Sequence, residues 1–309
     1  MVHPGYSQYN RWTKGKGAAR DRINKGIVVP EWQPSFQFAS GAKIFAIGSC
    51  FARNVEKALA QKQVEVTSID SDSNILEIRT NLLTGLLNKY NPVSIHQELE
   101  WAIGSKAFPE EGFIEFEDKY FDLSLRDQAQ KGAIEFVKMR RQKLREYFVG
   151  AFNADLVIVT LGLTETWFDR VTRLALAEVP SPRLLKQYPE RFGCKLLSCS
   201  ECESILKSMH TLMRKYGRPD LKMIITVSPV ALARTFSGQD IIVANMMSKS
   251  TLRSAAGAFA AATDGVDYFP SYEAAMVSNP KHVWMPDRRN VSDFIVEQII
   301  DEFTLRYQL

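Results

Sequence analysis

The sequence predicts an α/β fold, a three-layer α/β/α sandwich around a mostly parallel five-stranded sheet. From residue 43 onward, short apolar runs rich in β-branched and aromatic residues alternate with segments of helical periodicity. The runs are continuously apolar, as in strands that are buried on both faces, and 309 residues are enough to cover both faces with helices. The composition is 45% hydrophobic and 24% charged, which is typical of a globular protein and excludes an intrinsically disordered chain.

The expected elements follow one another along the whole chain. The five strands cover residues 43–48, 64–69, 155–162, 223–228 and 266–269. Helical periodicity predicts helices over residues 51–63, 75–90, 92–103, 128–153, 201–216, 240–262 and 292–307. Two segments interrupt this alternation: residues 113–125 alternate polar and apolar side chains as a hairpin does, and residues 172–198 contain three prolines without a clear period. Both are interpreted as insertions at the rim of the sheet.

Residues 1–41 are expected to form a basic arm that packs on a single domain spanning residues 42–309. Residues 1–26 carry six Lys or Arg against one acid, so the net charge of +4 belongs to the arm rather than to the body. Nucleic-acid binding requires clustered positive charge on the folded body, so no nucleic-acid partner is expected. The sequence sets no oligomeric state.

Location and metal content follow from what the sequence lacks. No apolar stretch approaches the roughly 20 residues of a membrane-spanning helix, and the first residues have no apolar signal core, which favours a cytoplasmic location with reduced cysteines. Cys194, Cys199 and Cys202 have the C-x4-C-x2-C spacing of some iron-sulfur proteins, but no fourth cysteine follows them. They are interpreted as structural, and no metal site is predicted.

The first strand runs into a glycine turn that carries a hydroxyl and a thiol. Gly48, Ser49 and Cys50 lead directly into the first helix, at the carboxyl end of a strand, where ligands of parallel sheets bind. Unpaired N–H groups at a helix N-terminus stabilise an anion and lower the pKa of a thiol. Cys50 is therefore a candidate nucleophile, and the alternative is a buried cysteine that only fills the strand-helix junction.

Several motifs in this order point to one family. Residues 48–52 read Gly-Ser-Cys-Phe-Ala, and further motifs stand at residues 32–36, 91–94, 160–162, 226–230, 248–250 and 268–273. With these motifs the chain resembles the GSCFA family, which is distantly related to the SGNH (GDSL) hydrolases. The resemblance covers most of residues 30–300 and implies an SGNH-like fold with an active site in the first turn.

The resemblance also assigns residues to the SGNH motif blocks. The nucleophilic serine of the first block falls on Cys50, whose backbone N–H would be one oxyanion donor. The third block falls on residues 162–165, which implies site roles for Gly162, Thr164 and Glu165. The donor of the second block would follow the second strand, where Asn81, Gly85 and Asn91 are the candidates.

The motif that usually supplies the catalytic base departs from the SGNH pattern. The family of hydrolases has Asp-x-x-His before the last helix, whereas this chain has Asp287 followed three residues later by Asn290. Asparagine cannot accept a proton near neutral pH, so a serine nucleophile would be nearly inert at such a site. Three alternatives remain: a recruited base such as His282 or Glu273, a thiolate that needs no base, or a protein that binds without catalysing.

The resemblance implies ester-directed acyl chemistry on a carbohydrate or related small acceptor. The enzyme would be an esterase or an acyl-CoA-dependent O-acyltransferase with a cysteine nucleophile; it would require no cofactor, with acyl-CoA as the optional co-substrate. Lys249 and Arg253, one helical turn apart, are the expected anion or phosphate contacts. Trp101, Trp167 and Trp284 are interpreted either as sugar-stacking residues or as core. The alternative function is a non-catalytic binding module that kept the fold after losing the histidine.

Overall fold

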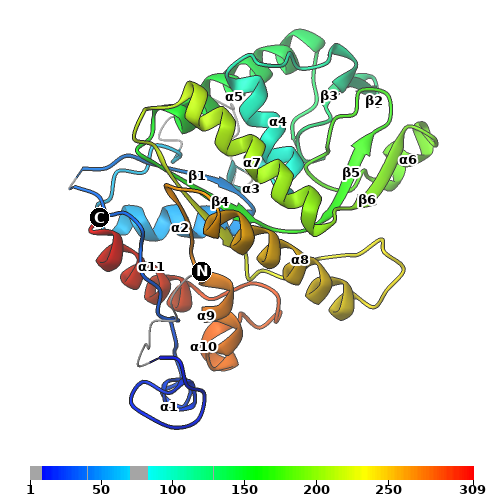
Figure 1. Ribbon diagram of the computed structural model, residues 1–309. Helices are drawn as coiled ribbons and strands as arrows, with labels where there is room; N and C mark the ends of the chain where they lie inside the picture. The colour runs from blue at the N-terminus through cyan, green and yellow to red at the C-terminus, as the bar shows by residue number, and fades with distance from the viewer. Residues whose placement is uncertain (1–8, 40, 70–82, 128) are drawn as a thin grey trace.

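The computed structural model describes residues 9–39, 41–69, 83–127 and 129–309. At its centre is a parallel sheet of four strands in the order β1-β4-β7-β8, formed by Ile44–Gly48, Leu156–Leu161, Lys222–Val227 and Val266–Tyr268 (Figure 1). Gly48 is in register with Thr160, and Thr160 with Thr226, so three neighbouring strands end at the same edge. The predicted α/β fold with a mostly parallel sheet is confirmed.

Residues 64–69 were expected to add a fifth strand, and the described residues do not form one. Val66 makes a single parallel bridge to Ile44. Two residues further along β1, the backbone N–H of Ala46 donates to the Ser68 hydroxyl at 2.9 Å instead of to a backbone carbonyl. A side-chain acceptor satisfies this buried donor, so the ladder ends after one bridge and the described sheet has four strands.

Helices cover both faces of the sheet. One face carries α2 (Cys50–Gln61), α9 (Ser271–Val277), α10 (Pro280–Val283) and α11 (Asp293–Tyr307), and the other carries α4 (Pro92–Ala102), α5 (Ile134–Asn153), α7 (Cys199–Tyr216) and α8 (Ile241–Ala261). Alternate strand residues serve the two cores: Ile44 and Ala46 pack with α2 and α11, whereas Phe45 and Ile47 pack with α5. The continuously apolar strand pattern reflects this burial on both faces.

Two hairpins lie outside the central sheet. The predicted hairpin forms from β2 (Phe113–Phe116) and β3 (Lys119–Asp122), preceded by the 3-10 turn η1 (Glu110–Gly112). The second hairpin, β5 (Glu165–Asp169) with β6 (Phe192–Leu196), was not predicted. Its strands are separated by a long connection that contains α6 (Pro182–Gln187), so the pairing depends on tertiary packing and not on a local turn signal.

Half of the expected helix, residues 75–82 of 75–90, falls outside the described residues. Its described part contains only the short helix α3 (Leu83–Leu86). No helix among the described residues is long and apolar enough to span a bilayer.

The arm contains the short helix α1 (Ala19–Ile23), and its later part lies along α9 and α11. The backbone N–H of Val28 donates to the Ser278 hydroxyl at 2.9 Å, and that of Phe38 donates to the Tyr307 carbonyl at 2.9 Å. The Trp32 ring lies 5.2 Å from that of Phe269. Aromatic contacts and hydrogen bonds from the backbone of the arm therefore hold it against α9 and α11.

Candidate active site

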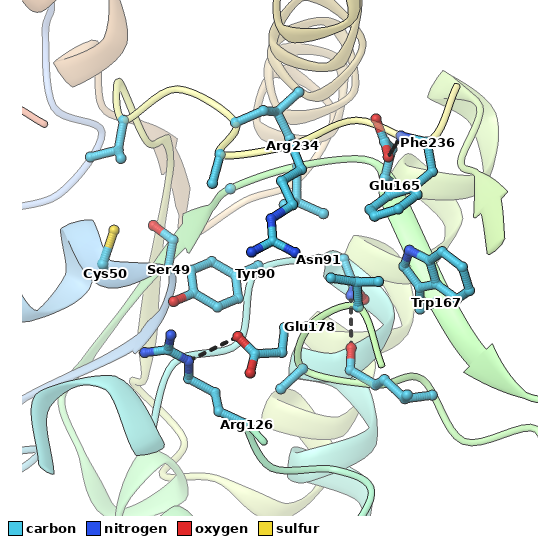
Figure 2. A pocket seen from close by; sticks show the side chains of 18 of the residues that line it. Ser49, Cys50, Tyr90, Asn91, Arg126, Glu165, Trp167, Glu178, Arg234 and Phe236 are labelled. Atoms are coloured by element: carbon cyan, nitrogen blue, oxygen red, sulfur yellow. Dashed lines mark hydrogen bonds and ion pairs between the residues drawn. The ribbon is translucent and has the colours of Figure 1, made fainter. Parts of the chain in front are cut away.

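A cavity of about 390 Å³ opens at the carboxyl edge of the sheet, where ligands of parallel sheets bind. Ser49 and Cys50 line it after β1, Gly162 after β4 and Ser228 after β7. The remaining wall comes from residues 90–91, 126–127, 163, 165, 167, 176–182, 230–234, 236 and 289. Figure 2 shows Ser49 and Cys50 at one end of this pocket, with Trp167 at the opposite end.

The turn after β1 has a geometry that only glycine fits. Gly48 has a φ of 139°, and a Cβ there would lie 2.2 Å from the carbonyl oxygen of Thr160 on β4. Ser49 follows as the N-cap of α2, and its hydroxyl accepts the N–H of Phe51 at 3.3 Å. Cys50 is therefore the first residue of α2 and lies in the pocket wall, where the sequence analysis expected it.

The electrostatic environment of Cys50 differs from the expectation. Burial raises the pKa of the thiol, although Arg289, Lys249 and the N–H groups of Cys50 and Phe51 act in the opposite direction. The N–H groups of the helix N-terminus act to lower this pKa as predicted, but the loss of hydration outweighs them and both cations, so the expected net lowering is wrong. The thiol is mainly protonated at neutral pH and needs a proton acceptor to become a nucleophile.

Lys249 was expected as an anion contact, but its side chain is buried at 1% exposure. Its Nζ donates to the carbonyl oxygen of Gly162 at 2.6 Å. Burial lowers the pKa of Lys249 to about 7. Cys50 acts against this shift, whereas the positive charge of Arg289 lowers the pKa further. A substantial fraction of this amine is neutral near pH 7, and it interacts electrostatically with the Cys50 thiol.

The Asp287 to Asn290 motif forms a closed loop. The Asn290 Nδ2 donates to Asp287 Oδ2 at 2.5 Å, and Asp287 Oδ1 accepts the backbone N–H groups of Arg289 and Asn290 at 3.0 and 2.9 Å. These hydrogen bonds hold the pKa of Asp287 below its usual value, with the largest effect from the backbone N–H of Asn290 and the next from that of Arg289. This arrangement directs Arg289 into the pocket wall, and neither Asp287 nor Asn290 lines the pocket.

The side-chain bond between Asn290 and Asp287 has the form of the bond that orients a catalytic histidine, which leads to a prediction. Asn290→His should raise turnover of a generic ester by at least roughly tenfold, because general-base assistance is worth about a hundredfold or more when geometry is favourable. Steady-state rates of the folded variant test this. Adding Asp287→Asn should remove part of the gain, and an unchanged rate would mean that position 290 does not reach the thiol.

The other candidate bases lie outside the pocket. His282 is exposed on α10, with its ring 5.9 Å from that of Phe294. Glu273 forms an ion pair with Arg253 and accepts the Tyr268 hydroxyl at 2.9 Å. The expected anion contact Arg253 is thus bound in this pair, and it borders a separate hollow beside Trp32.

The predicted oxyanion donors are mostly occupied. The N–H groups of Gly162 and Leu163 both donate to the Tyr90 carbonyl, at 2.9 and 3.0 Å. Thr164 directs its N–H and its hydroxyl to the Ser248 hydroxyl, at 2.9 and 3.3 Å, and does not line the pocket. The backbone N–H of Cys50 remains the candidate donor.

The remaining predicted residues have mixed positions. Asn91 lines the pocket and caps α4, accepting the Ser94 N–H at 2.8 Å. Gly85 gives Arg126 room, since a Cβ there would lie 2.3 Å from its Nη1. Glu165 lines the pocket, but its carboxylate accepts hydrogen bonds from the loop at 235–236. Asn81 lies outside the described residues.

The structure adds pocket residues that the sequence analysis did not select. They are Tyr90, Arg126, Glu178, Ser228, Arg234, Phe236 and Arg289. Ser228 ends a predicted strand, and Arg289 lies inside the Asp287 to Asn290 motif, so two signals were present in the sequence. The others come from loops whose approach to the sheet edge no strand pattern locates.

The cysteines outside the first turn lie apart from the pocket. Cys194 and Cys199 are exposed, Cys202 is buried, and all are free. Across the described residues, no three His, Cys, Asp or Glu side chains are placed to hold one metal ion.

The family model of the GSCFA family matches residues 43–303. The chain belongs to the GSCFA family. A search of curated proteins gave no match. Among solved structures, the chain is similar to a Clostridium thermocellum family 3 carbohydrate esterase at 10% identity and a TM-score of 0.33, over 85% of this chain and 95% of that chain. A likeness at that score supports no conclusion about activity.

Each letter of the family signature has a distinct structural role in this GSCFA protein. Gly48 permits the close approach to Thr160, Ser49 caps α2, and Cys50 lines the pocket. Phe51 and Ala52 are fully buried in the core between α2 and the sheet. The signature therefore describes how the first turn is built and anchored.

Proposed function

We propose that this GSCFA protein cleaves an ester-linked acyl group, or transfers it to a hydroxyl acceptor, with Cys50 as the nucleophile. The observation that carries the proposal is the position of the thiol, in the wall of a cavity at the carboxyl edge of the sheet and on the first turn of α2. The N–H groups of that turn favour the negative charge that develops on sulfur during attack.

In this proposal, neutral Lys249 acts as the proton acceptor that replaces the missing histidine. The Cys50 S–H proton passes to Lys249 Nζ, and sulfur attacks the ester carbonyl carbon to form a tetrahedral oxyanion near the Cys50 N–H. The oxyanion collapses, the C–O bond breaks, and the alcohol leaves with the proton from Lys249. A thioester on Cys50 remains.

The thioester is then released by a second nucleophile. Water would give a free acid, whereas a hydroxyl acceptor would give a new ester. In both cases Lys249 takes the proton of the attacking oxygen, the C–S bond breaks, and the Cys50 sulfur takes that proton back from Lys249. Acyl-CoA as the donor is the transferase form of the same proposal, with CoA thiol as the first leaving group.

A carbohydrate or related polyol is the proposed carrier of the acyl group. Trp167 and Phe236 line the end of the pocket away from Cys50, with ring centroids 5.1 Å apart. The Trp167 indole N–H is buried and has no partner among the described residues. An aromatic face beside an unused donor suits a ring with hydroxyl groups. Trp101 packs in the core beside Phe108 and supports no such role.

The second candidate is a non-catalytic binding module, which the raised pKa of Cys50 and the exposed position of His282 favour. The two candidates differ in one product, acylated Cys50, which only the enzyme would form. Incubation with aryl and sugar acetates, followed by mass spectrometry of the intact protein and its peptides, should find the acyl group on Cys50. Ligand binding without acylation of Cys50 by any ester would support the binding module.

Removing Lys249 should change the reactivity of Cys50 even without a substrate. We expect Lys249→Met to slow alkylation of Cys50 at pH 8 by at least about tenfold, because methionine cannot accept the S–H proton that the mostly neutral Lys249 takes at this pH. Peptide mass spectrometry measures the rates, and the exposed Cys199, the first residue of α7, is an internal control that should not change. Equal Cys50 rates in both proteins would remove Lys249 from the mechanism.

A further inference from the structure

The pocket that contains Cys50 has two arginines without an acidic partner. The four other charged residues that line the pocket are paired or hydrogen-bonded within the protein: Arg126 pairs with Glu178 at 3.1 Å, and Asp127 pairs with Lys131 at 3.3 Å. The Glu165 carboxylate accepts hydrogen bonds from the loop at 235–236. Arg234 and Arg289 line the same pocket, and neither forms an ion pair with a carboxylate among the described residues.

Arg289 lies beside the reactive thiol. Its Nε is buried without a hydrogen-bond partner among the described residues, and its charge acts to lower the pKa of Cys50. Asp287 is the nearby acid, but its oxygens accept the backbone N–H groups of Arg289 and Asn290 and the Asn290 amide. The guanidinium therefore keeps unused donors at the pocket wall.

Arg234 lies on the loop between β7 and α8, and Ala231 on the same loop donates its backbone N–H to the Arg289 carbonyl at 3.3 Å. Arg234 is an exposed residue, and Figure 2 shows its guanidinium directed inward, between the end with Cys50 and the end with Trp167. The two arginines thus come from separate loops, at residues 230–236 and at residue 289, and contribute to one cavity.

The Nε of Arg289 is buried without a hydrogen-bond partner among the described residues, and the exposed Arg234 adds a second guanidinium to the lining of the same cavity. A guanidinium presents a planar fork of N–H donors that fits the oxygens of a carboxylate or a phosphate. Unpaired buried donors lose their hydration without compensation, so a protein gains by satisfying them with a ligand.

We propose that the molecule that enters this pocket carries an oxyanion, a carboxylate or a phosphate, which Arg234 and Arg289 bind. This inference rests on the proposed function for its ester, but the anion site itself depends only on the two arginines. The substrate class is then an acylated sugar acid or an acylated sugar phosphate, with the ester at Cys50 and the ring toward Trp167.

Binding of simple probes to a Cys50→Ala variant tests the anion site without requiring catalysis. We expect glucuronate or glucose 6-phosphate to bind at least about tenfold more tightly than glucose in titration calorimetry, and added salt to weaken the anion alone. Glucuronate tests binding of a carboxylate, and glucose 6-phosphate tests binding of a phosphate. The ligand that binds more tightly identifies which of the two oxyanions the site prefers. Glucose binding as tightly as both anions, or no anion binding at millimolar concentration, would overturn the proposal.

Charge variants assign the effect to residues. Arg234→Gln and Arg289→Gln should each reduce anion affinity by about tenfold or more and leave glucose binding unchanged. Arg288→Gln is the matched control, because it removes the same charge from the neighbouring exposed residue, which does not line the pocket. Arg289→Lys keeps the charge without the fork, and it should retain part of the affinity even if Arg289→Gln folds poorly. Equal anion affinity in wild type and both pocket variants would refute the assignment.

The anion site and the ester chemistry fail independently. Anion binding that depends on Arg234 and Arg289, together with an absence of acylation at Cys50, would retain the anion site and reject the proposed function. Acylation of Cys50 by neutral and anionic esters at equal rates, with no effect of either arginine, would retain the function and reject the anionic substrate.

Discussion

Cys50→Ala should lower ester turnover by at least about a thousandfold, because it removes the atom that forms the covalent intermediate in the proposed mechanism. Cys50→Ser should also lose most of the activity, since a hydroxyl is a far weaker acid than a thiol and Lys249, with its pKa of about 7, is a poor base for it. Initial rates on aryl and sugar esters, corrected for the fraction of folded protein, measure both effects.

The control for this experiment is a second cysteine in a comparable local setting. Cys199 is also the first residue of a helix, with Ser198 as N-cap, but it is exposed and does not line the pocket. Cys199→Ala should retain the wild-type rate. Full activity of Cys50→Ala would exclude covalent catalysis at this residue, and the turnover would then have to come from a directly activated water.

Glu98→Gln should lower the free energy of unfolding by about 3 to 5 kcal/mol, because it breaks a buried charge cluster. The Glu98 carboxylate lies 2.5 Å from Lys89 Nζ and 2.5 Å from Arg141 Nη2, and Arg141 also lies 3.6 Å from Asp122. All four side chains are buried. The neutral amide leaves two buried cations with only Asp122 as a counter-charge, and urea unfolding measures the loss.

A surface pair provides the comparison for Glu98. Glu117 and Arg183 form an ion pair in which the side chains are 53% and 82% exposed, so Glu117→Gln should change stability by less than about 1 kcal/mol. Equal effects of the two substitutions would mean that the buried cluster adds no more than an exposed pair.

The cluster also predicts how stability depends on pH. Burial alone would raise the pKa of Glu98, but Arg141 and Lys89 hold it below its usual value. A carboxylate whose pKa is lowered in the folded state stabilises the protein at pH values above its unfolded-state pKa. This stabilisation is lost as the pH falls through the folded-state pKa. The stability difference between wild type and Glu98→Gln should therefore shrink below a pH of about 4.5.

This cluster supports the pocket as well as the fold. The backbone N–H of Lys89 donates to the Gly48 carbonyl at 2.7 Å, and its Nζ donates to the Ser124 carbonyl at 2.8 Å. The next residue, Tyr90, lines the pocket and accepts the N–H of Gly162. Lys89 thus connects the first turn, the β2-β3 hairpin and α4 at the edge where Cys50 lies.

Local patterns were sufficient for the central strands and for the first turn. The runs at residues 43–48, 155–162 and 223–228 are apolar because both faces are buried, and that pattern is independent of their partners in the sheet. The run at residues 64–69 is also rich in β-branched residues, yet the Ser68 hydroxyl takes the Ala46 N–H and the ladder stops. Strand propensity does not determine whether the N–H groups of a neighbouring strand bond to backbone carbonyls or to side chains.

The amino-acid sequence by itself determined the α/β class, the glycine turn into the first helix, the position of Cys50 at the N-terminus of that helix and the absence of histidine at residue 290. These features depend on residues that are close together in the sequence, so periodicity and motif spacing are enough to predict them. Only the tertiary structure decided that Lys249 is buried against Gly162, that burial raises the pKa of Cys50, and that Arg234 and Arg289 meet in one pocket. The physical reason is that desolvation and charge pairing arise from groups far apart in the chain, whose distances are set only when the helices and loops close over the sheet.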